Sequence, residues 1–125
     1  MTCFTVRHLK TGYRFHLKAG NGQVIASSQP CDRVEDCLRG IEQARACADA
    51  PVEDQTLHAF PVCPCPKYLL RGDLRKGFTF SLCGPDGTLL MHSKTYTAKR
   101  SCQTGIGSVR RSLAQAQVFV QEEDQ

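Results

Sequence analysis

Residues 12–28, GYRFHLKAGNGQVIASS, and residues 77–93, GFTFSLCGPDGTLLMHS, follow one pattern twice at a constant offset of 65. The alignment continues without a gap to residue 41 in the first copy and to residue 106 in the second. A pattern repeated at a fixed period predicts one structural unit used twice, because a unit of this length cannot bury its apolar face alone. The identical pairs are Leu9/Leu74, Gly12/Gly77, Phe15/Phe80, Leu17/Leu82, Gly22/Gly87, Ser28/Ser93, Cys37/Cys102, Gly40/Gly105, Ile41/Ile106 and Arg45/Arg110.

Each copy begins with a predicted three-stranded meander. Around Phe15 and around Phe80, apolar and other residues alternate with a period of two, which is typical of a strand with one buried face. The pairs Asn21-Gly22 and Asp86-Gly87 follow these strands and are typical of hairpin turns. The expected strands are 3–9, 13–17 and 23–28 in the first copy and 68–74, 78–82 and 88–93 in the second.

After each meander the apolar period changes to that of an amphipathic helix, which predicts helices at 33–48 and 98–114 with Asp32 and Thr97 as N-caps. Gly40 and Gly105 lie in the middle of these helices. Glycine there costs about 1 kcal/mol relative to alanine, so we expect close packing of each helix on the sheet. A last strand is expected at 55–60 and at 117–121, and the proline-rich segment 61–66 is typical of a linker.

The chain has 125 residues, eight cysteines and a formal net charge of +4. This length is typical of one domain, whereas half of it would be marginal alone. The first ten residues, MTCFTVRHLK, contain no apolar signal core, so we expect a cytoplasmic protein with free thiols rather than a disulfide framework. Residues 67–111 hold nine basic side chains against only Asp73 and Asp86, so the second copy is the basic one.

Two stretches carry a resemblance to a known family. RFHLKAGNGQVIASS (14–28) and YTAKRSCQTGIGSVRRS (96–112) resemble the YegP family, small bacterial proteins without an assigned function. The resemblance implies a β3αβ unit that shares one sheet with a second copy and exchanges its last strand, and it implies no catalytic residues. The first copy has Cys31 where the family favours tyrosine, whereas the second keeps Tyr96. Any binding surface is therefore expected to be asymmetric.

We predict an α+β fold of two tandem β3αβ repeats, with one mostly antiparallel sheet and two helices packed on one face. The expected parts are repeat 1 at about 1–60, a linker at 61–66, repeat 2 at about 67–121 and an acidic tail at 122–125. Because each repeat supplies the burial that the other needs, we expect a monomer. An exposed apolar patch on the open face of the sheet would favour association with a partner instead, and such a patch would centre on Phe4 and Val6.

Basic side chains are the candidate binding residues, because cations on one surface can follow a phosphate backbone. Runs of charge are more often solvated faces. The aromatic residues fall on the inward alternation, so a stacking platform for single-stranded nucleic acid is not predicted. The candidate ligand-binding residues are Arg14, His16, Lys18, Lys94, Lys99 and Arg100, joined by Arg110 and Arg111.

Five of the eight cysteines fall into three groups. Cys63 and Cys65, with His58, offer three metal ligands, but zinc sites usually need a second pair, and none with that spacing is present. The repeated Cys37 and Cys102 fall on the apolar helix stripes and are predicted to pack in the core. Cys83 alternates outward on its strand, which predicts the most reactive thiol on a strand.

The sequence offers weak support for catalysis. His92 could act on Ser93 or Cys102, but nothing fixes the required geometry, and we expect Ser28 and Ser93 to bond backbone groups. No P-loop, GxGxxG, HExxH or paired-carboxylate spacing is present. We predict a non-enzymatic binding or interaction module without a cofactor. Nucleic-acid or polyanion binding through the basic second repeat is the alternative, and thiol- or metal-dependent activity is the third.

Overall fold

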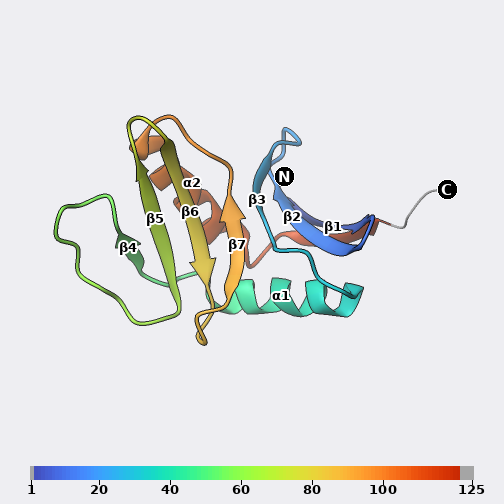
Figure 1. Ribbon diagram of the computed structural model, residues 1–125. Coiled ribbons are helices and arrows are strands. Elements are labelled where there is room, and N and C mark those ends of the chain that lie inside the picture. Colours follow the sequence, from blue (N-terminus) through green and yellow to red (C-terminus); the bar gives the residue numbers. More distant parts are fainter. Residues whose placement is uncertain (1, 122–125) are drawn as a thin grey trace.

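The computed structural model describes residues 2–121 and arranges them in one eight-stranded sheet with two helices (Figure 1). The first half contains β1 (Cys3–Leu9), β2 (Gly12–Lys18), β3 (Val24–Ser27), α1 (Val34–Ala46) and β4 (Val52–Asp54). The second half contains β5 (Lys67–Asp73), β6 (Gly77–Cys83), β7 (Leu89–Ser93), α2 (Lys99–Ser112) and β8 (Gln117–Gln121). The strand order is β4-β5-β6-β7-β3-β2-β1-β8. The predicted α+β class is confirmed, and the acidic tail lies outside the described residues.

The last strand of each half lies beside the first strand of the other half. β4 pairs in parallel with β5, with Val52 opposite Tyr68, and β8 pairs in parallel with β1, with Val118 opposite Phe4. The other neighbouring pairs in residues 2–121 are antiparallel, and β3 and β7 join the halves through two residue pairs. The two halves are therefore tied together both at the centre of the sheet and at its edges (Figure 1).

The first hairpins of the two halves differ by one residue. Leu9 pairs with Gly12 in the first half, whereas Asp73 pairs with Gly77 in the second. Residues 10–11 make the first connection and residues 74–76 the second. Leu74, which is identical to Leu9 in the sequence alignment, therefore lies in a turn and is 88% exposed. The gapless alignment does not extend into the first strands.

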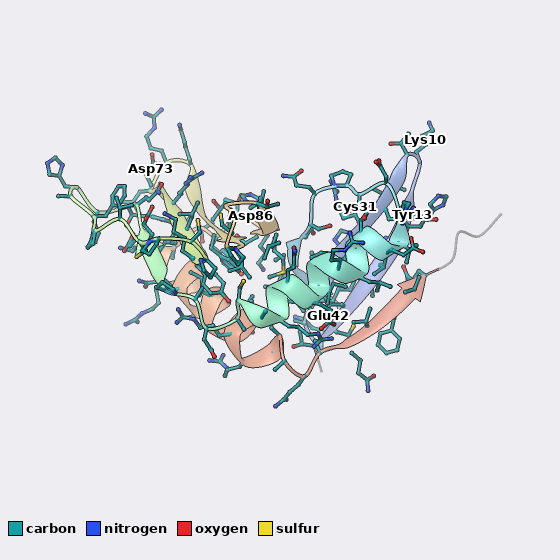
Figure 2. The ribbon with its side chains drawn as sticks, turned by 90° about the horizontal axis from the view of Figure 1, so that it is seen from below. Lys10, Tyr13, Cys31, Glu42, Asp73 and Asp86 are labelled. Atoms are coloured by element: carbon teal, nitrogen blue, oxygen red, sulfur yellow. The ribbon has the colours of Figure 1, made fainter. Side chains whose placement is uncertain are left out.

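Each helix begins three residues after an isolated bridge that pins the chain to a strand of the same half. Figure 2 shows the two residues of the first bridge, Tyr13 and Cys31, near one end of α1. The bridges are Tyr13–Cys31 and Phe78–Tyr96. The prediction of Asp32 and Thr97 as N-caps is wrong, because the cap positions are Arg33 and Ala98 and neither makes a side-chain cap bond. The bridge, rather than a capping side chain, sets where each helix starts.

The mid-helix glycines allow the helices to approach the sheet. A Cβ atom added at Gly40 would lie 3.2 Å from the ring of Phe15, and one added at Gly105 would lie 3.1 Å from the ring of Phe80. These distances are shorter than ordinary van der Waals contact. The expected close packing of both helices on one face of the sheet is confirmed.

Apolar side chains of both halves form one core between the helices and this face. Ile41 and Ile106 are 0% and 3% exposed and lie within it. The expectation that Phe4 and Val6 could form an exposed patch is wrong, because both are fully buried. Alternation along β1 turns them toward the helices, on the same side as Leu17, which pairs with Phe4.

β4 occurs at Val52–Asp54 and not at the predicted 55–60. The strand begins directly after Pro51, whose carbonyl accepts the Tyr68 N–H at 2.8 Å. It ends where Asp54 Oδ1 accepts the Thr56 N–H at 3.0 Å, which forms a local turn. The predicted strand at 117–121 is confirmed. Of the part of the chain that the structure describes, neither helix is long and apolar enough to cross a membrane.

Candidate functional site

One row of polar side chains crosses the middle of the sheet on the face opposite to the helices. His16 lies opposite Ser27, Ser27 opposite His92, and His92 opposite Ser81, so the row runs over β2, β3, β7 and β6. The strand neighbours of these residues, such as Phe15, point into the core. Because side chains alternate along a strand, the row faces away from the helices.

The row contains two histidine–serine pairs. Nδ1 of His16 lies 2.7 Å from Oγ of Ser27, and Nδ1 of His92 lies 2.9 Å from Oγ of Ser81. An offset of 65 relates His16 to Ser81 and Ser27 to His92. The histidine and the serine have therefore exchanged places between the halves. His92 is exposed, whereas His16 is half-buried.

A depression of about 350 Å³ lies beside this row at the junction of β3 and β7. Arg14 and Ser27 line it from the first half, and His92 and Lys94 line it from the second. Nε of Arg14 is buried and has no hydrogen-bond partner among the described residues. Burying a donor without a partner is unfavourable, so this atom marks a position where an acceptor would be stabilised.

Positive charge gathers around His16. Burial lowers the pKa of His16 below its ordinary value, and the charges of Arg14, Lys18 and Arg7 lower it further. Protonation would place another cation among these side chains, so the neutral imidazole is favoured. The arginines and the lysine therefore supply the positive charge on this part of the face.

Four of the six predicted ligand-binding residues lie on or beside this region. Arg14, His16 and Lys18 are on β2, and their alternation with the buried Phe15 and Leu17 turns them to the uncovered face. Lys94 follows β7 and lines the depression. The structure thus brings together cations from both halves that are 76 to 80 residues apart in the sequence.

The other predicted cations lie elsewhere. Lys99 and Arg100 are the first residues of α2, and Nζ of Lys99 forms an ion pair with Oδ2 of Asp54 at 2.7 Å. Arg110 is half-buried and donates to the carbonyl of Ala50. Lys99, Arg100 and Arg110, all on α2, therefore do not join Lys94 in one surface with the cations of β2.

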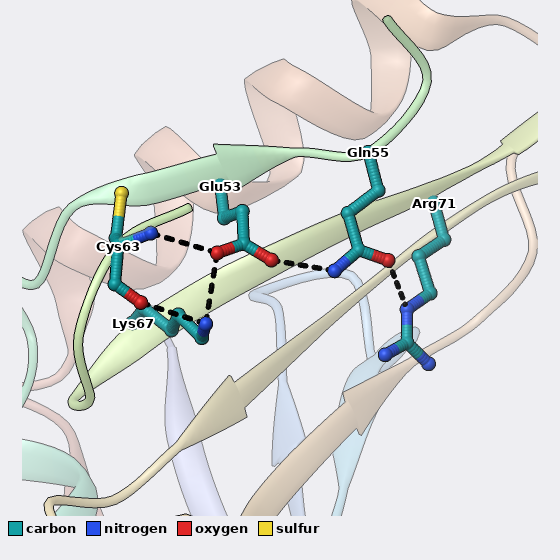
Figure 3. Close-up of polar contacts among 5 residues, drawn as sticks. All are labelled: Glu53, Gln55, Cys63, Lys67 and Arg71. Carbon is teal, nitrogen blue, oxygen red and sulfur yellow. Dashed lines mark hydrogen bonds and ion pairs between the residues drawn. The ribbon is translucent and has the colours of Figure 1, made fainter. Parts of the chain in front are cut away.

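A second polar cluster holds the proline-rich segment against β5 (Figure 3). Oε1 of Glu53 accepts from Nζ of Lys67 and from the backbone N–H of Cys63, both at 2.8 Å. Oε2 of Glu53 accepts from Nε2 of Gln55, whose Oε1 accepts from Nε of Arg71 at 2.9 Å. Hydrogen bonds from Lys67, Gln55 and Cys63 lower the pKa of Glu53 to about 2. The predicted linker is therefore packed on the sheet.

This packing overturns the prediction for Cys83. Cys83 does alternate away from the core residues of β6, but it is only 8% exposed. Its register partner is Lys67, and Cys65 and Glu53 also lie close enough to act on its charge. Burial raises the pKa of the Cys83 thiol, which lowers its reactivity. The prediction of a reactive outward thiol is wrong because the proline-rich segment covers this part of the sheet.

The repeated cysteines lie in the core, as predicted. Cys37 and Cys102 are fully buried. Burial is the main cause that raises the pKa of Cys37 to about 12 and that of Cys102 to about 11. Cys102 lies on the helix side of the sheet, whereas His92 is exposed on the other side, so these two do not form a catalytic pair.

The repeated serines bond the backbone. Oγ of Ser93 accepts the Phe80 N–H at 2.9 Å and donates to the Lys94 carbonyl at 2.7 Å, and Ser28 makes the equivalent bonds in the first half. The predicted backbone role of both serines is confirmed. The alternative in which His92 activates Ser93 is wrong, because His92 pairs with a different serine.

The histidine–serine pairs can exchange hydrogen bonds with a ligand. A nucleophilic serine would need its histidine oriented by a third group. In residues 2–121, neither His16 nor His92 is hydrogen-bonded to a carboxylate. In the same range, no group of three histidine, cysteine or acidic side chains is arranged to hold a metal ion, so His58, Cys63 and Cys65 do not converge.

Sequence analysis singled out neither the serines of the histidine–serine pairs nor Glu53. Ser27 and Ser81 carried a detectable signal, because histidine and serine exchange places at two pairs of positions related by the repeat. Glu53 carried none. Its partners Lys67 and Cys63 come from a segment that reaches Glu53 only when the loop folds back on β5.

The family model described as "domain of unknown function (DUF1508)" matches residues 10–54 and again residues 74–119. A UPF0339 protein encoded in the ptx operon 5′ region of Stutzerimonas stutzeri is 28% identical over 116 residues, which are 92% of each chain. A UPF0339 protein of Pseudomonas aeruginosa is 27% identical over 90% of this chain and 91% of its own.

Two solved structures share the fold. The solution NMR structure of the Escherichia coli protein of unknown function yegP has a TM-score of 0.78 and 22% identity over 99% of this chain and 96% of its own. The solution NMR structure of a UPF0339 protein of Shewanella oneidensis has a TM-score of 0.77 and 18% identity, and the match covers 95% of this chain and 90% of its own. Because one family model covers most of both halves, the chain belongs to the DUF1508 family, whose relatives include the YegP and UPF0339 proteins.

Proposed function

We propose that the protein is a non-enzymatic binding module that takes an anionic ligand on the uncovered face of its sheet. The observation that carries this proposal is the depression at the junction of β3 and β7. Arg14 and Lys94 reach it from different halves, and Nε of Arg14 has no acceptor within the described residues. Phosphate and carboxylate oxygens are the acceptors that a guanidinium group binds best.

The surroundings of the depression favour an anion. Among the described residues that line it there is no carboxylate. Ser27 and the exposed His92 also line it and add hydrogen-bonding groups. Arg7 and Lys18 lie near enough to depress the pKa of His16, and their field raises the local concentration of anions.

We also infer that the halves are tandem copies of one β3αβ unit whose shared face has become asymmetric. Thr79 stands in the second half where Arg14 stands in the first, and Gln29 stands in the first half where Lys94 stands in the second. Each half therefore contributes one cation from a different position. This pattern suits a single ligand without two-fold symmetry.

The test is isothermal titration of the full chain with inorganic phosphate and with tripolyphosphate. Arg14→Gln and Lys94→Gln are each expected to weaken binding by about tenfold or more. Arg75→Gln is the matched control, because it removes the same charge from the exposed turn between β5 and β6. Undetectable binding by the unmodified chain, or an equal loss in all three variants, would overturn the proposal.

An extended polyanion such as a nucleic acid is the second candidate. Arg7, Arg14 and Lys18 all act on His16, so cations extend beyond the depression over β1 and β2. A single-stranded oligonucleotide would reveal this mode through an affinity that falls steeply as salt rises. Strong oligonucleotide binding with no binding of tripolyphosphate would favour the extended polyanion.

A further inference from the structure

We infer a second ligand site on the helix side of the sheet: a groove beside α1 that takes one planar aromatic ring of the phenol class. Ser28 and Gln29 line both hollows, whereas Cys31, Gly40 and Leu89 line only the groove. It follows from comparing the same place in the two halves of the molecule, one of which is filled by a tyrosine and the other of which is not.

In the second half, Tyr96 covers the mid-helix glycine of α2. A Cβ atom added at Gly105 would lie 2.5 Å from Oη and 3.0 Å from Cζ of Tyr96. The Tyr96 ring also stacks on Phe80, with centroids 6.3 Å apart and an interplanar angle of 21°. Gly105 is consequently buried. The fold therefore provides room for a phenol ring between the bridge residue and the helix.

In the first half, the equivalent residue is Cys31, which is too short to fill this room. Among the described residues outside its own helix, only the Phe15 ring lies within 4 Å of a Cβ atom added at Gly40, and Gly40 is half-buried. A groove of about 440 Å³ lies here, and Cys31, Gly40 and Leu89 line it. Cys31 and Asp86, which also lines it, lie on the same side of α1 (Figure 2).

The lining of the groove suits an aromatic ring with a polar substituent. Leu89 and Leu90 supply apolar surface from β7. Phe15 is only 1% exposed, so a ring would lie over Gly40 and against Leu89 rather than displace core side chains. Arg39, which is paired with Asp36 at 2.9 Å, lines the rim and offers hydrogen-bond donors to a phenol oxygen.

The experiment is a titration of the isotopically labelled full chain with 4-methylphenol, followed by amide chemical shifts. Saturable shifts are expected at Gly40 and Cys31 but not at Gly105. Cys31→Tyr supplies the missing ring and should weaken binding by about tenfold or more, whereas Cys31→Ser keeps the groove open and should change affinity by less than about twofold. The non-planar 4-methylcyclohexanol should bind more weakly than 4-methylphenol.

The reciprocal substitution, Tyr96→Cys, provides a second and independent test. Tyr96→Cys should open the equivalent groove in the second half and produce new saturable shifts at Gly105. If that variant does not fold, Cys31→Tyr still decides, because its new side chain copies one that already fits the other half. Unchanged 4-methylphenol binding by Cys31→Tyr, or shifts that spread over the surface without saturating, would show that the groove is not a ring site.

Discussion

At the scale of single residues, Glu53 has the most unusual environment among the described carboxylates. It is 2% exposed and accepts hydrogen bonds from Lys67, Gln55 and the backbone of Cys63. A buried charge is tolerated only when it is paired and hydrogen-bonded. Glu53 therefore acts as the anchor that holds the proline-rich segment over β5 and over Cys83.

The pH dependence of stability should reveal this anchor. Folding lowers the pKa of Glu53 from 4.5 to about 2, so the unfolded chain binds the proton more tightly. The contribution of Glu53 to stability is then present above about pH 4.5 and is lost as the pH falls toward about 2. Denaturant unfolding between about pH 5 and 2 should show a steeper loss for the unmodified chain than for Glu53→Gln.

The exposed Glu42 provides the control, since Glu42→Gln should follow the unmodified chain. If the free energy of unfolding falls with pH equally in the unmodified chain and in Glu53→Gln, the anchoring role of Glu53 is refuted. Glu53→Gln should also increase alkylation of Cys83 by iodoacetamide, because the segment that covers this thiol is released.

At the scale of elements, each helix uses one arginine to hold the chain that leads into the exchanged strand of the other half. Arg45 on α1 donates to the carbonyl of Ala116 at 2.7 Å, just before β8, and lies 5.5 Å from the centroid of the Phe4 ring. Arg110 on α2 donates to the carbonyl of Ala50, before β4. These two arginines are an identical pair in the repeat.

Arg45→Met should lower the free energy of unfolding by about 1–3 kcal/mol, because charge-assisted hydrogen bonds to half-buried carbonyls are lost while packing volume is kept. Arg39→Met is the matched control. It removes an exposed pair with Asp36 and should cost less than about 1 kcal/mol. Chemical denaturation measures the free energy of unfolding of both variants. Equal losses of this free energy would contradict the role of Arg45.

The helix-to-sheet contacts depend on Ile41 and Ile106. Either residue changed to alanine should cost about 2–5 kcal/mol, because each is almost completely buried. The double change Cys63→Ser and Cys65→Ser should cost little, since Glu53 binds the backbone N–H of Cys63, which serine retains. Thermal melts test both expectations. If the double-serine variant melts at a much lower temperature while the isoleucine variants melt near the unmodified chain, the proline-rich segment contributes more to stability than the helix-to-sheet contacts.

At the scale of the whole molecule, the exchange of β4 and β8 makes each half depend on the other. β4 has its sheet partner in β5, and β8 has its partner in β1. A half-chain would leave these edges unpaired, and unpaired edges recruit other strands. The expectation that the intact chain is a monomer remains a prediction, which light scattering can test.

Cutting the chain between Pro61 and Pro66 should therefore give halves that are unfolded or that pair with themselves. Each fragment has about 60 residues, a length at which an independent core is marginal. The measurement is the mass and the melting curve of each purified half, followed by the same measurements after mixing. Recovery of a cooperative melt on mixing is expected. A half that stays monomeric and melts cooperatively alone would contradict the shared core.

Much of the architecture follows from local properties of the sequence. Alternation around Phe15 and Phe80 predicted the central strands, and the apolar stripes through Ile41 and Ile106 predicted both helices. These signals are readable because burial on one face imposes a period of 2 on a strand and of 3.6 on a helix. The exchange of last strands was reached only through the family resemblance, because periodicity does not say which strand a segment pairs with.

The tertiary structure alone decided which side chains meet. It paired His92 with Ser81, placed Arg14 and Lys94 around one depression at the junction of β3 and β7, and covered Cys83 with a segment predicted to be a linker. Each of these arrangements depends on the path of the chain between the residues. The pattern of apolar residues determines which face of each element is buried, whereas contacts on the other face depend on strand order and loop path, which have no local period in the sequence.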